Sequence, residues 1–124
     1  MTILIAHNQA GNSRSIKSRL KKDGYQVIIS NSYPKAVLQV QQHHPDLIIT
    51  DLAYSSSAFK MINEIKQGPG KKTPILILSG LGQENLVEQA FDLGADDYIS
   101  QPNKLEELSL RINLLAKGRI KAEA

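Results

Sequence analysis

The sequence contains no cysteine and no tryptophan, and only 5% of its residues are aromatic. The absence of cysteine excludes disulfides and thiol chemistry, and it removes the usual ligands of structural zinc. No apolar run is long enough to cross a bilayer, and no basic-then-apolar leader opens the chain, so we expect no membrane contact and a cytoplasmic location. Neither sign of charge dominates, because the chain has 15 Lys and Arg against 12 Asp and Glu, a net charge of only +3. Such a small excess is more typical of a solvated surface than of a site for an acidic partner.

The 124 residues are 41% hydrophobic and 22% charged, which is ordinary for one globular domain with a real core. Short apolar runs alternate along the chain with segments of helical periodicity, and turn residues separate them. The runs predict strands at residues 2–6, 25–29, 47–51, 74–79 and 98–100. The periodic segments predict helices ending near Lys22, opening at Pro34, covering 59–65 and 86–93, and covering 105–115. The serine-rich stretch 54–58 and the glycine-rich stretch 68–72 are expected to be loops.

Strands that alternate with helices require parallel pairing through right-handed crossovers. We therefore predict an α/β fold, a doubly wound five-stranded parallel sheet of order 2-1-3-4-5, as in flavodoxin-like (βα)5 proteins. The domain is expected to span residues 1–117, with residues 118–124 forming a C-terminal tail. The sequence shows neither internal repeats nor low-complexity segments.

The third predicted strand is a buried run that ends in a single carboxylate, Asp51. In open α/β sheets, binding and chemical sites lie at the carboxyl ends of the strands, next to the switch point. The same edge is expected to hold His7 and Asn8 after the first strand and Ser79 at the end of the fourth. Asp46 precedes the third strand, so it should lie at the opposite edge of the sheet.

Three segments resemble the receiver domain of bacterial two-component response regulators. The most specific is LGADDYISQP at residues 93–102, which is similar to the segment that closes that domain. Residues 45–52 look like the strand that carries the phosphoacceptor, and residues 73–80 look like the fourth strand with its switch hydroxyl. The resemblance covers nearly the whole chain and implies a phosphorelay signalling domain that is not an enzyme.

Carried over residue by residue, the resemblance makes Asp51 the phosphoacceptor. It also makes Ser79 the hydroxyl that turns toward the phosphoryl group, and Tyr98 the aromatic switch. Purely structural roles remain possible for both residues, because Ser79 could simply end a strand and Tyr98 could be a half-buried core aromatic.

Other positions depart from the family pattern. The acidic pair that holds Mg²⁺ in the family is replaced by His7 and Asn8, and the lysine before the last proline is replaced by Gln101. The loop after Asp51 also lacks the family's proline and is one residue short. Mg²⁺ prefers carboxylate oxygens, and a neutral amide binds phosphate less strongly than a cation does. We therefore expect a degenerate, or pseudo-, receiver in which Mg²⁺ binds weakly and phosphorylation is impaired.

Alternatives remain. The chain could be a working receiver, phosphorylated on Asp51, that controls an effector such as a DNA-binding domain. His7 could pair with Asp51 and stand in for the cation, or it could be a solvated loop residue. A more distant alternative is a flavodoxin-type protein whose loop at residues 8–15 cradles a phosphate or a flavin.

The expected partners are proteins, such as a histidine kinase or a phosphotransfer protein. The resemblance suggests that docking or homodimerisation uses the face from Gln83 to Leu115. This domain itself shows no helix-turn-helix and no basic-aromatic platform for nucleic acid. His43 and His44 with Asp46 are a weak candidate for a transition-metal site, since adjacent histidines seldom converge on one ion.

Overall fold

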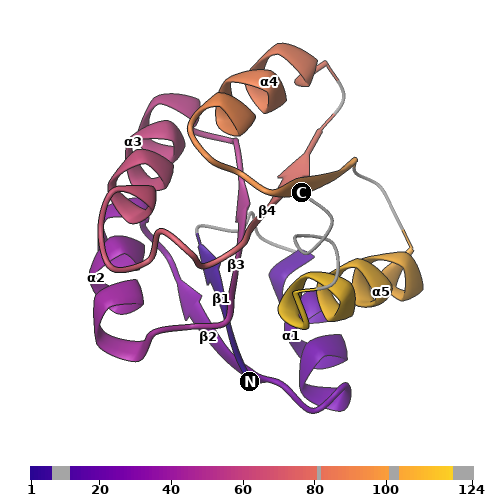
Figure 1. The fold of residues 1–124 in the computed structure, drawn as a ribbon. Coiled ribbons are helices and arrows are strands. Elements are labelled where there is room, and N and C mark those ends of the chain that lie inside the picture. The colour runs from indigo at the N-terminus through magenta and orange to yellow at the C-terminus, as the bar shows by residue number, and fades with distance from the viewer. Residues whose placement is uncertain (7–11, 81, 101–103, 119–124) are drawn as a thin grey trace.

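Strands and helices alternate along the chain in the computed structural model, which describes residues 1–6, 12–80, 82–100 and 104–118 (Figure 1). The strands are β1 (Thr2–Ala6), β2 (Gln26–Ser30), β3 (Leu47–Asp51), β4 (Ile75–Ser79) and β5 (Asp97–Ser100). The helices are α1 (Asn12–Lys22), α2 (Tyr33–His43), α3 (Ser55–Lys66), α4 (Glu84–Asp92) and α5 (Leu105–Ala116).

The strands form one parallel sheet in the order β2-β1-β3-β4-β5, which confirms the predicted topology. The register places Ala6 opposite both Ser30 and Thr50, and Ser79 opposite Ser100. The carboxyl ends of neighbouring strands therefore meet along one edge, as parallel pairing requires. That edge is where the candidate site lies.

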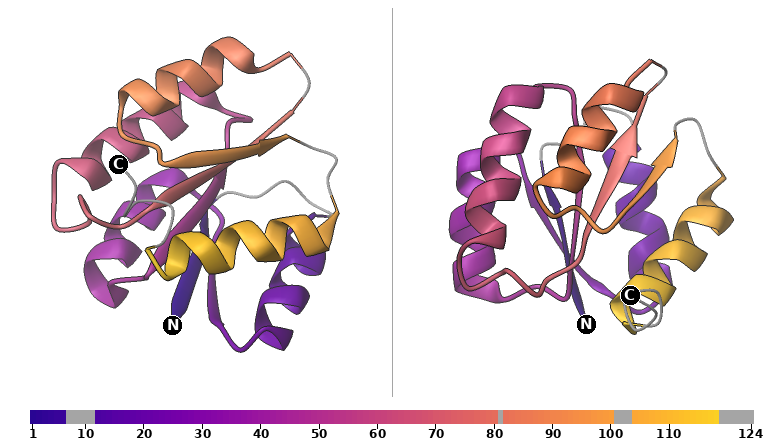
Figure 2. Two further views of the ribbon diagram at one scale, coloured as in Figure 1. Left: turned by 45° about the vertical axis from the view of Figure 1, so that its right-hand side comes forward. Right: turned by 45° about the horizontal axis from the view of Figure 1, so that its top comes forward.

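Two apolar clusters fill the two faces of the sheet, because successive side chains of a strand point to opposite sides. One cluster contains Leu4, Ile48 and Ile77 and is covered by α2, α3 and α4. The other contains Ile3, Ile49 and further strand residues, and it is covered by α1 and α5. Figure 2 shows the resulting three layers, with α1 and α5 together on one side of the sheet.

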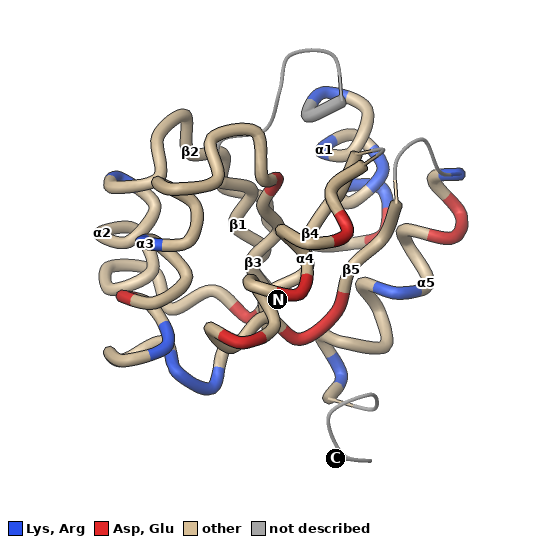
Figure 3. Tube along the Cα trace, turned by 90° about the horizontal axis from the view of Figure 1, so that it is seen from above, with Lys and Arg blue, Asp and Glu red and all other residues tan. Residues whose placement is uncertain are grey.

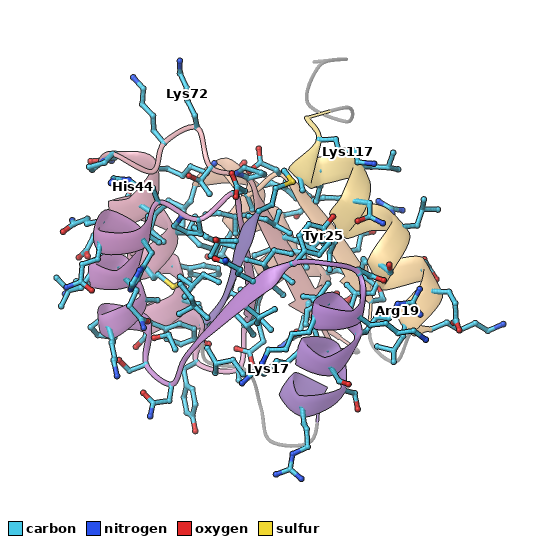
Figure 4. The ribbon with its side chains drawn as sticks, turned by 90° about the horizontal axis from the view of Figure 1, so that it is seen from below. Lys17, Arg19, Tyr25, His44, Lys72 and Lys117 are labelled. Atoms are coloured by element: carbon cyan, nitrogen blue, oxygen red, sulfur yellow. The ribbon has the colours of Figure 1, made fainter. Side chains whose placement is uncertain are left out.

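Several boundaries differ from the sequence prediction, most of them by one or two residues, and two of the differences have a local structural cause. The serines at residues 55–57 form the first turn of α3, so the expectation of a loop there is wrong. The amide of Ala58 donates to the carbonyl of Tyr54 at 2.9 Å and closes that turn. Tyr25 precedes β2 instead of opening it: its amide donates to Leu20, and its side chain extends toward α5 (Figure 4).

The β4–β5 region is anchored by Asp96, which accepts from the amide of Ile75 at 2.8 Å and from Lys66 at 3.1 Å. Lys66 also donates to the carbonyl of Thr73 at 2.7 Å. The turn between α4 and β5 passes over Lys66 at Gly94, whose φ of +117° favours glycine. Within the described part of the chain, no helix has the length and apolar character needed to span a membrane.

Candidate functional site

Asp51 ends the central strand β3 and is partly buried at the carboxyl edge of the sheet. It is in register with Leu78 of β4, so Ser79, the next residue of β4, lies one position beyond it on the neighbouring strand. Ser79 is buried. The structure therefore brings the expected phosphoacceptor position and the expected switch hydroxyl to the same place in the fold.

The carboxylate of Asp51 is held by a tyrosine that the sequence analysis did not include. The hydroxyl of Tyr33 donates to Oδ1 of Asp51 at 2.6 Å, and the amide of Ala53 points to the same oxygen at 3.4 Å. A distance of 2.6 Å is typical of a strong hydrogen bond from a hydroxyl to a charged oxygen. Tyr33 is only 3% exposed, so water has little access to its side chain.

Tyr33 is positioned by the start of α2. Ser32 is the N-cap, and its side chain accepts from the amide of Lys35 at 3.1 Å. Pro34 occupies the first turn, where its fixed φ suits the helix. The Tyr33 side chain then joins the same apolar cluster as Ala6, the last residue of β1. Because β1 lies between β2 and β3, the Tyr33 side chain reaches from the end of β2 across β1 to the end of β3.

The pKa of the Tyr33 phenol is raised well above its ordinary value. Burial of the ring is the largest cause, followed by the hydrogen bond to Asp51 and the charge of that carboxylate. A hydrogen bond from the backbone of Tyr54 to the phenol partly opposes them. The hydroxyl therefore stays protonated at neutral pH and acts as a donor to Asp51.

Ser79 and Tyr98 line one pocket of roughly 430 Å³, which lies beside α4 and β5. Tyr98 is 43% exposed, so it is half-buried, but it belongs to neither apolar cluster and is not a core residue. Its ring meets that of Phe91 edge to face, with centroids 6.0 Å apart. The exposed Tyr98 side chain therefore lines the pocket and does not fill it.

Several predicted residues lie outside the described ranges, namely His7, Asn8 and Gln101. The pairing of His7 with Asp51 therefore remains a prediction, and so does the phosphate cradle, because the first half of its loop, residues 8–11, is also outside. Asp46 is described, and it lies at the opposite edge as predicted, where its Oδ2 accepts from the amide of Thr2 at 2.8 Å.

The described residues do not by themselves make a site for a divalent cation at Asp51. They contain no group of three or more His, Cys, Asp or Glu side chains that could hold a metal, which also leaves His43, His44 and Asp46 without support as a site. Oδ1 of Asp51 already accepts the Tyr33 hydrogen bond. Mg²⁺ requires octahedral oxygen ligands and usually one or two carboxylates.

Sequence reasoning missed Tyr33 because it was assigned only to the opening of α2. One signal was available, since a residue directly after the second strand lies at the same sheet edge as Asp51. That position predicts that Tyr33 lies at this edge of the sheet, but it does not predict the contact with Asp51. The contact depends on the reach of the side chain across β1 and on the short loop after β3.

A parallel sheet of order 2-1-3-4-5, with an aspartate ending the central strand and a serine ending its neighbour, is the arrangement of a receiver domain. The chain belongs to this family: the response regulator receiver domain matches residues 3–113. Receiver domains are signalling domains, and they typically bind Mg²⁺ at the phosphorylation site.

Similar curated proteins are response regulators. The chain is 31% identical over 118 residues to the two-component response regulator PhoP of Pseudomonas aeruginosa, covering 94% of this chain and 52% of PhoP. It is 32% identical to the response regulator RR06 of Streptococcus pneumoniae, covering 94% of this chain and 54% of RR06. The chain thus spans about half the length of these relatives.

Solved structures show the same fold. A response regulator structure from Chloroflexus aurantiacus superimposes with a TM-score of 0.86 and 26% identity, covering 94% of this chain and 97% of that one. The receiver domain of the sensor histidine kinase PA1611 from Pseudomonas aeruginosa gives a TM-score of 0.84 at 23% identity, covering 94% and 97%. That structure contains a magnesium ion coordinated in its active-site cleft.

Proposed function

We propose that this chain is an atypical receiver domain that works through protein contacts, with Mg²⁺-dependent phosphorylation impaired at Asp51. The domain spans residues 1–117 in this proposal, residues 118–124 are a tail, and the expected compartment is the cytoplasm. The domain itself is not an enzyme and does not bind nucleic acid. The observation that carries the proposal is the charge of the site: Asp51 is retained, while His7, Asn8 and Gln101 replace the family's two acids and its lysine.

The physical argument concerns the charge that develops during phosphoryl transfer. The transferring group spreads negative charge over its equatorial oxygens, so catalysis depends on positioning and on cations. Losing two metal-binding carboxylates weakens the Mg²⁺ site, and losing the lysine removes a second positive charge. The Tyr33 hydroxyl adds a donor to Asp51 but no positive charge. Both the transfer and the retention of the phosphoryl group are therefore disfavoured.

Beryllofluoride, which imitates a phosphoryl group on aspartate, provides the test. The chain is titrated with Mg²⁺ in the presence of beryllofluoride while amide spectra are recorded. We expect no saturation at sub-millimolar Mg²⁺. Rebuilding the family pattern with His7→Asp, Asn8→Asp and Gln101→Lys should restore saturable shifts around Asp51 and Ser79. Adding Asp51→Asn to the rebuilt chain is the matched control and should abolish them.

Binding of Mg²⁺ and beryllofluoride by the unmodified chain would contradict the proposal. Saturable shifts in the unmodified chain at sub-millimolar Mg²⁺, lost on Asp51→Asn, would mean that the site is intact. The second candidate function would then hold, a working receiver that passes its signal to an effector. The retained Asp51, Ser79 and Tyr98 favour that candidate. So does the name of one relative, the KDP operon transcriptional regulatory protein KdpE of Escherichia coli, which this chain covers over 49% of its length.

The partners proposed for the domain are a histidine kinase or a phosphotransfer protein, and a second copy of the chain. The contact surface is the α4–β5–α5 face, from Gln83 to Leu115. Exposed Phe91 and Tyr98 rings on this face support the proposal. The family match favours a receiver over the flavodoxin-type alternative.

A further inference from the structure

The hydrogen bond between Tyr33 and Asp51 joins three elements at the candidate site. Tyr33 is the first residue of α2, and Asp51 is the last residue of β3. The phenol oxygen also receives a hydrogen bond from the backbone of Tyr54, the residue that precedes α3. A phenol has one proton to donate, and here that proton is directed at Oδ1 of Asp51.

We propose that Tyr33 is a positioning residue that holds the Asp51 carboxylate in one orientation and competes with a cation or a phosphoryl group for it. This inference rests on the proposed function, because it assumes that Asp51 is the position such a group would occupy. It adds a second cause of impairment, which is independent of the missing acids and lysine.

Burial is what makes the competition effective. A ligand that takes Oδ1 must break the 2.6 Å hydrogen bond and leave the Tyr33 hydroxyl without that acceptor. The ring is buried in the apolar cluster beneath α2 and α3, so water cannot readily replace the carboxylate. The backbone carbonyl of Asp51 also lies near this hydroxyl, but at 3.5 Å it is a distant acceptor and replaces the lost contact only in part. A buried donor that loses its good partner costs more free energy than the net gain from an ordinary hydrogen bond. Binding at Asp51 is therefore opposed by the cost of displacing Tyr33.

The Tyr33 hydroxyl also cannot replace the cations on which phosphoryl transfer depends. It satisfies an oxygen of the carboxylate but remains neutral, because the pKa of the phenol is raised by burial and by Asp51 itself. Unlike a metal ion or a lysine, it contributes no positive charge to the developing phosphoryl group. Its contribution is to fix the carboxylate in its unmodified state.

The substitution Tyr33→Phe tests this inference, because it keeps the ring in the apolar cluster and removes only the hydroxyl. Tyr54→Phe is the matched control: Tyr54 is 58% exposed, and the substitution leaves in place the hydrogen bond that its backbone makes to the phenol. Apparent binding of beryllofluoride with Mg²⁺ is measured by fluorine resonance in both the unmodified chain and the rebuilt chain with His7→Asp, Asn8→Asp and Gln101→Lys. The rebuilt chain, in which binding is expected to be restored, serves for the comparison if the unmodified chain binds too weakly.

We expect Tyr33→Phe to tighten binding roughly fivefold to a hundredfold in the rebuilt chain, the cost of leaving one buried donor without its acceptor. Tyr54→Phe should leave binding unchanged. The side-chain carboxyl carbon resonance of Asp51 at neutral pH should move in Tyr33→Phe and stay in place in Tyr54→Phe. A role limited to packing would leave that resonance where it is.

Equal affinity of Tyr33→Phe and its parent, with an unmoved Asp51 carboxyl resonance, would overturn the inference and leave the proposed function standing. Tight binding by the unmodified chain would instead remove the proposed function. The ratio between Tyr33→Phe and its parent would still decide the role of Tyr33. The two failures are thus separate observations.

Discussion

The bond from Tyr33 to Asp51 couples the ionisation of a phenol to the charge of a carboxylate. After burial, that carboxylate is the main cause of the raised pKa of Tyr33. The isosteric substitution Asp51→Asn removes the charge and retains an acceptor. We expect the phenolate of Tyr33 to form at lower pH in Asp51→Asn than in the unmodified chain, as measured by ultraviolet absorbance during alkaline titration.

The raised pKa of Tyr33 also makes the stability of the fold depend on pH. A tyrosine whose folded pKa lies above its unfolded value, near 10, stabilises the fold fully below about pH 10 and loses that contribution as pH rises further. Tyr33→Phe identifies which part of the absorbance change belongs to Tyr33 among the four tyrosines. An unchanged Tyr33 titration in Asp51→Asn would show that the carboxylate does not act on the phenol.

The contact between these two residues could not be predicted from the sequence, although the place of Asp51 could. An apolar run that ends in one carboxylate predicts a central strand, and the strand order then gives the edge. Tyr33 follows an edge strand two positions away, and only the reach of its side chain past Ala6 brings the groups together. Side-chain reach across a strand leaves no periodic signal.

At the scale of elements, the helix boundaries were harder to predict than the helices. Residues 55–57 are three serines, which are common in loops but also suit the first turn of a helix. The apolar periodicity that marks α3 starts only at Ala58 and Phe59, so the first turn carries no pattern of its own. The end of α4 was predictable, because Gly94 follows its last periodic residue.

Gly94 tests how tightly the α4–β5 turn is packed. A Cβ at this position would lie 2.8 Å from Cγ of Lys66, and Lys66 is held in place by Asp96 and Thr73. We expect Gly94→Ala to reduce the free energy of unfolding by about 2–6 kcal/mol, the sum of a positive φ and overpacking. Denaturant unfolding measures the change.

Gly24 is the matched control for this substitution. Its φ of +99° is also positive, but nothing lies within 4 Å of the Cβ that an alanine would add. Gly24→Ala should cost only the backbone strain, about 1–3 kcal/mol. If both alanines cost the same, Lys66 yields to the added methyl group and the turn is less constrained than the structure indicates.

At the scale of the whole molecule, the topology was predictable from the sequence, but the place of its charged residues in space was not. Strict alternation of strands and helices leaves few compact parallel sheets, and the observed order is the predicted one. The small net charge of +3 conceals a local excess, because α1 carries five basic residues and no acidic one. Figure 3 places this basic helix on the far side of the molecule from α2 and α3.

The α4–β5–α5 face gives the last prediction, which concerns association. Phe91 on α4 and Tyr98 on β5 form an exposed aromatic pair, and aromatic side chains commonly dominate the energy of an interface. If two copies meet on this face, Phe91→Glu should raise the dissociation constant of the dimer by about tenfold or more, because a charge would be buried without a partner. Sedimentation over a range of concentrations measures it.

Leu38 on α2 supplies the control for that experiment. It is 57% exposed, more than Phe91 at 38%, yet it lies on a helix outside the proposed face. Leu38→Glu introduces the same charge and should leave association unchanged. Equal weakening by both substitutions would point to a general effect of charge on solubility. A chain that stays monomeric at every concentration would rule out homodimerisation of this domain and leave its face to a different protein.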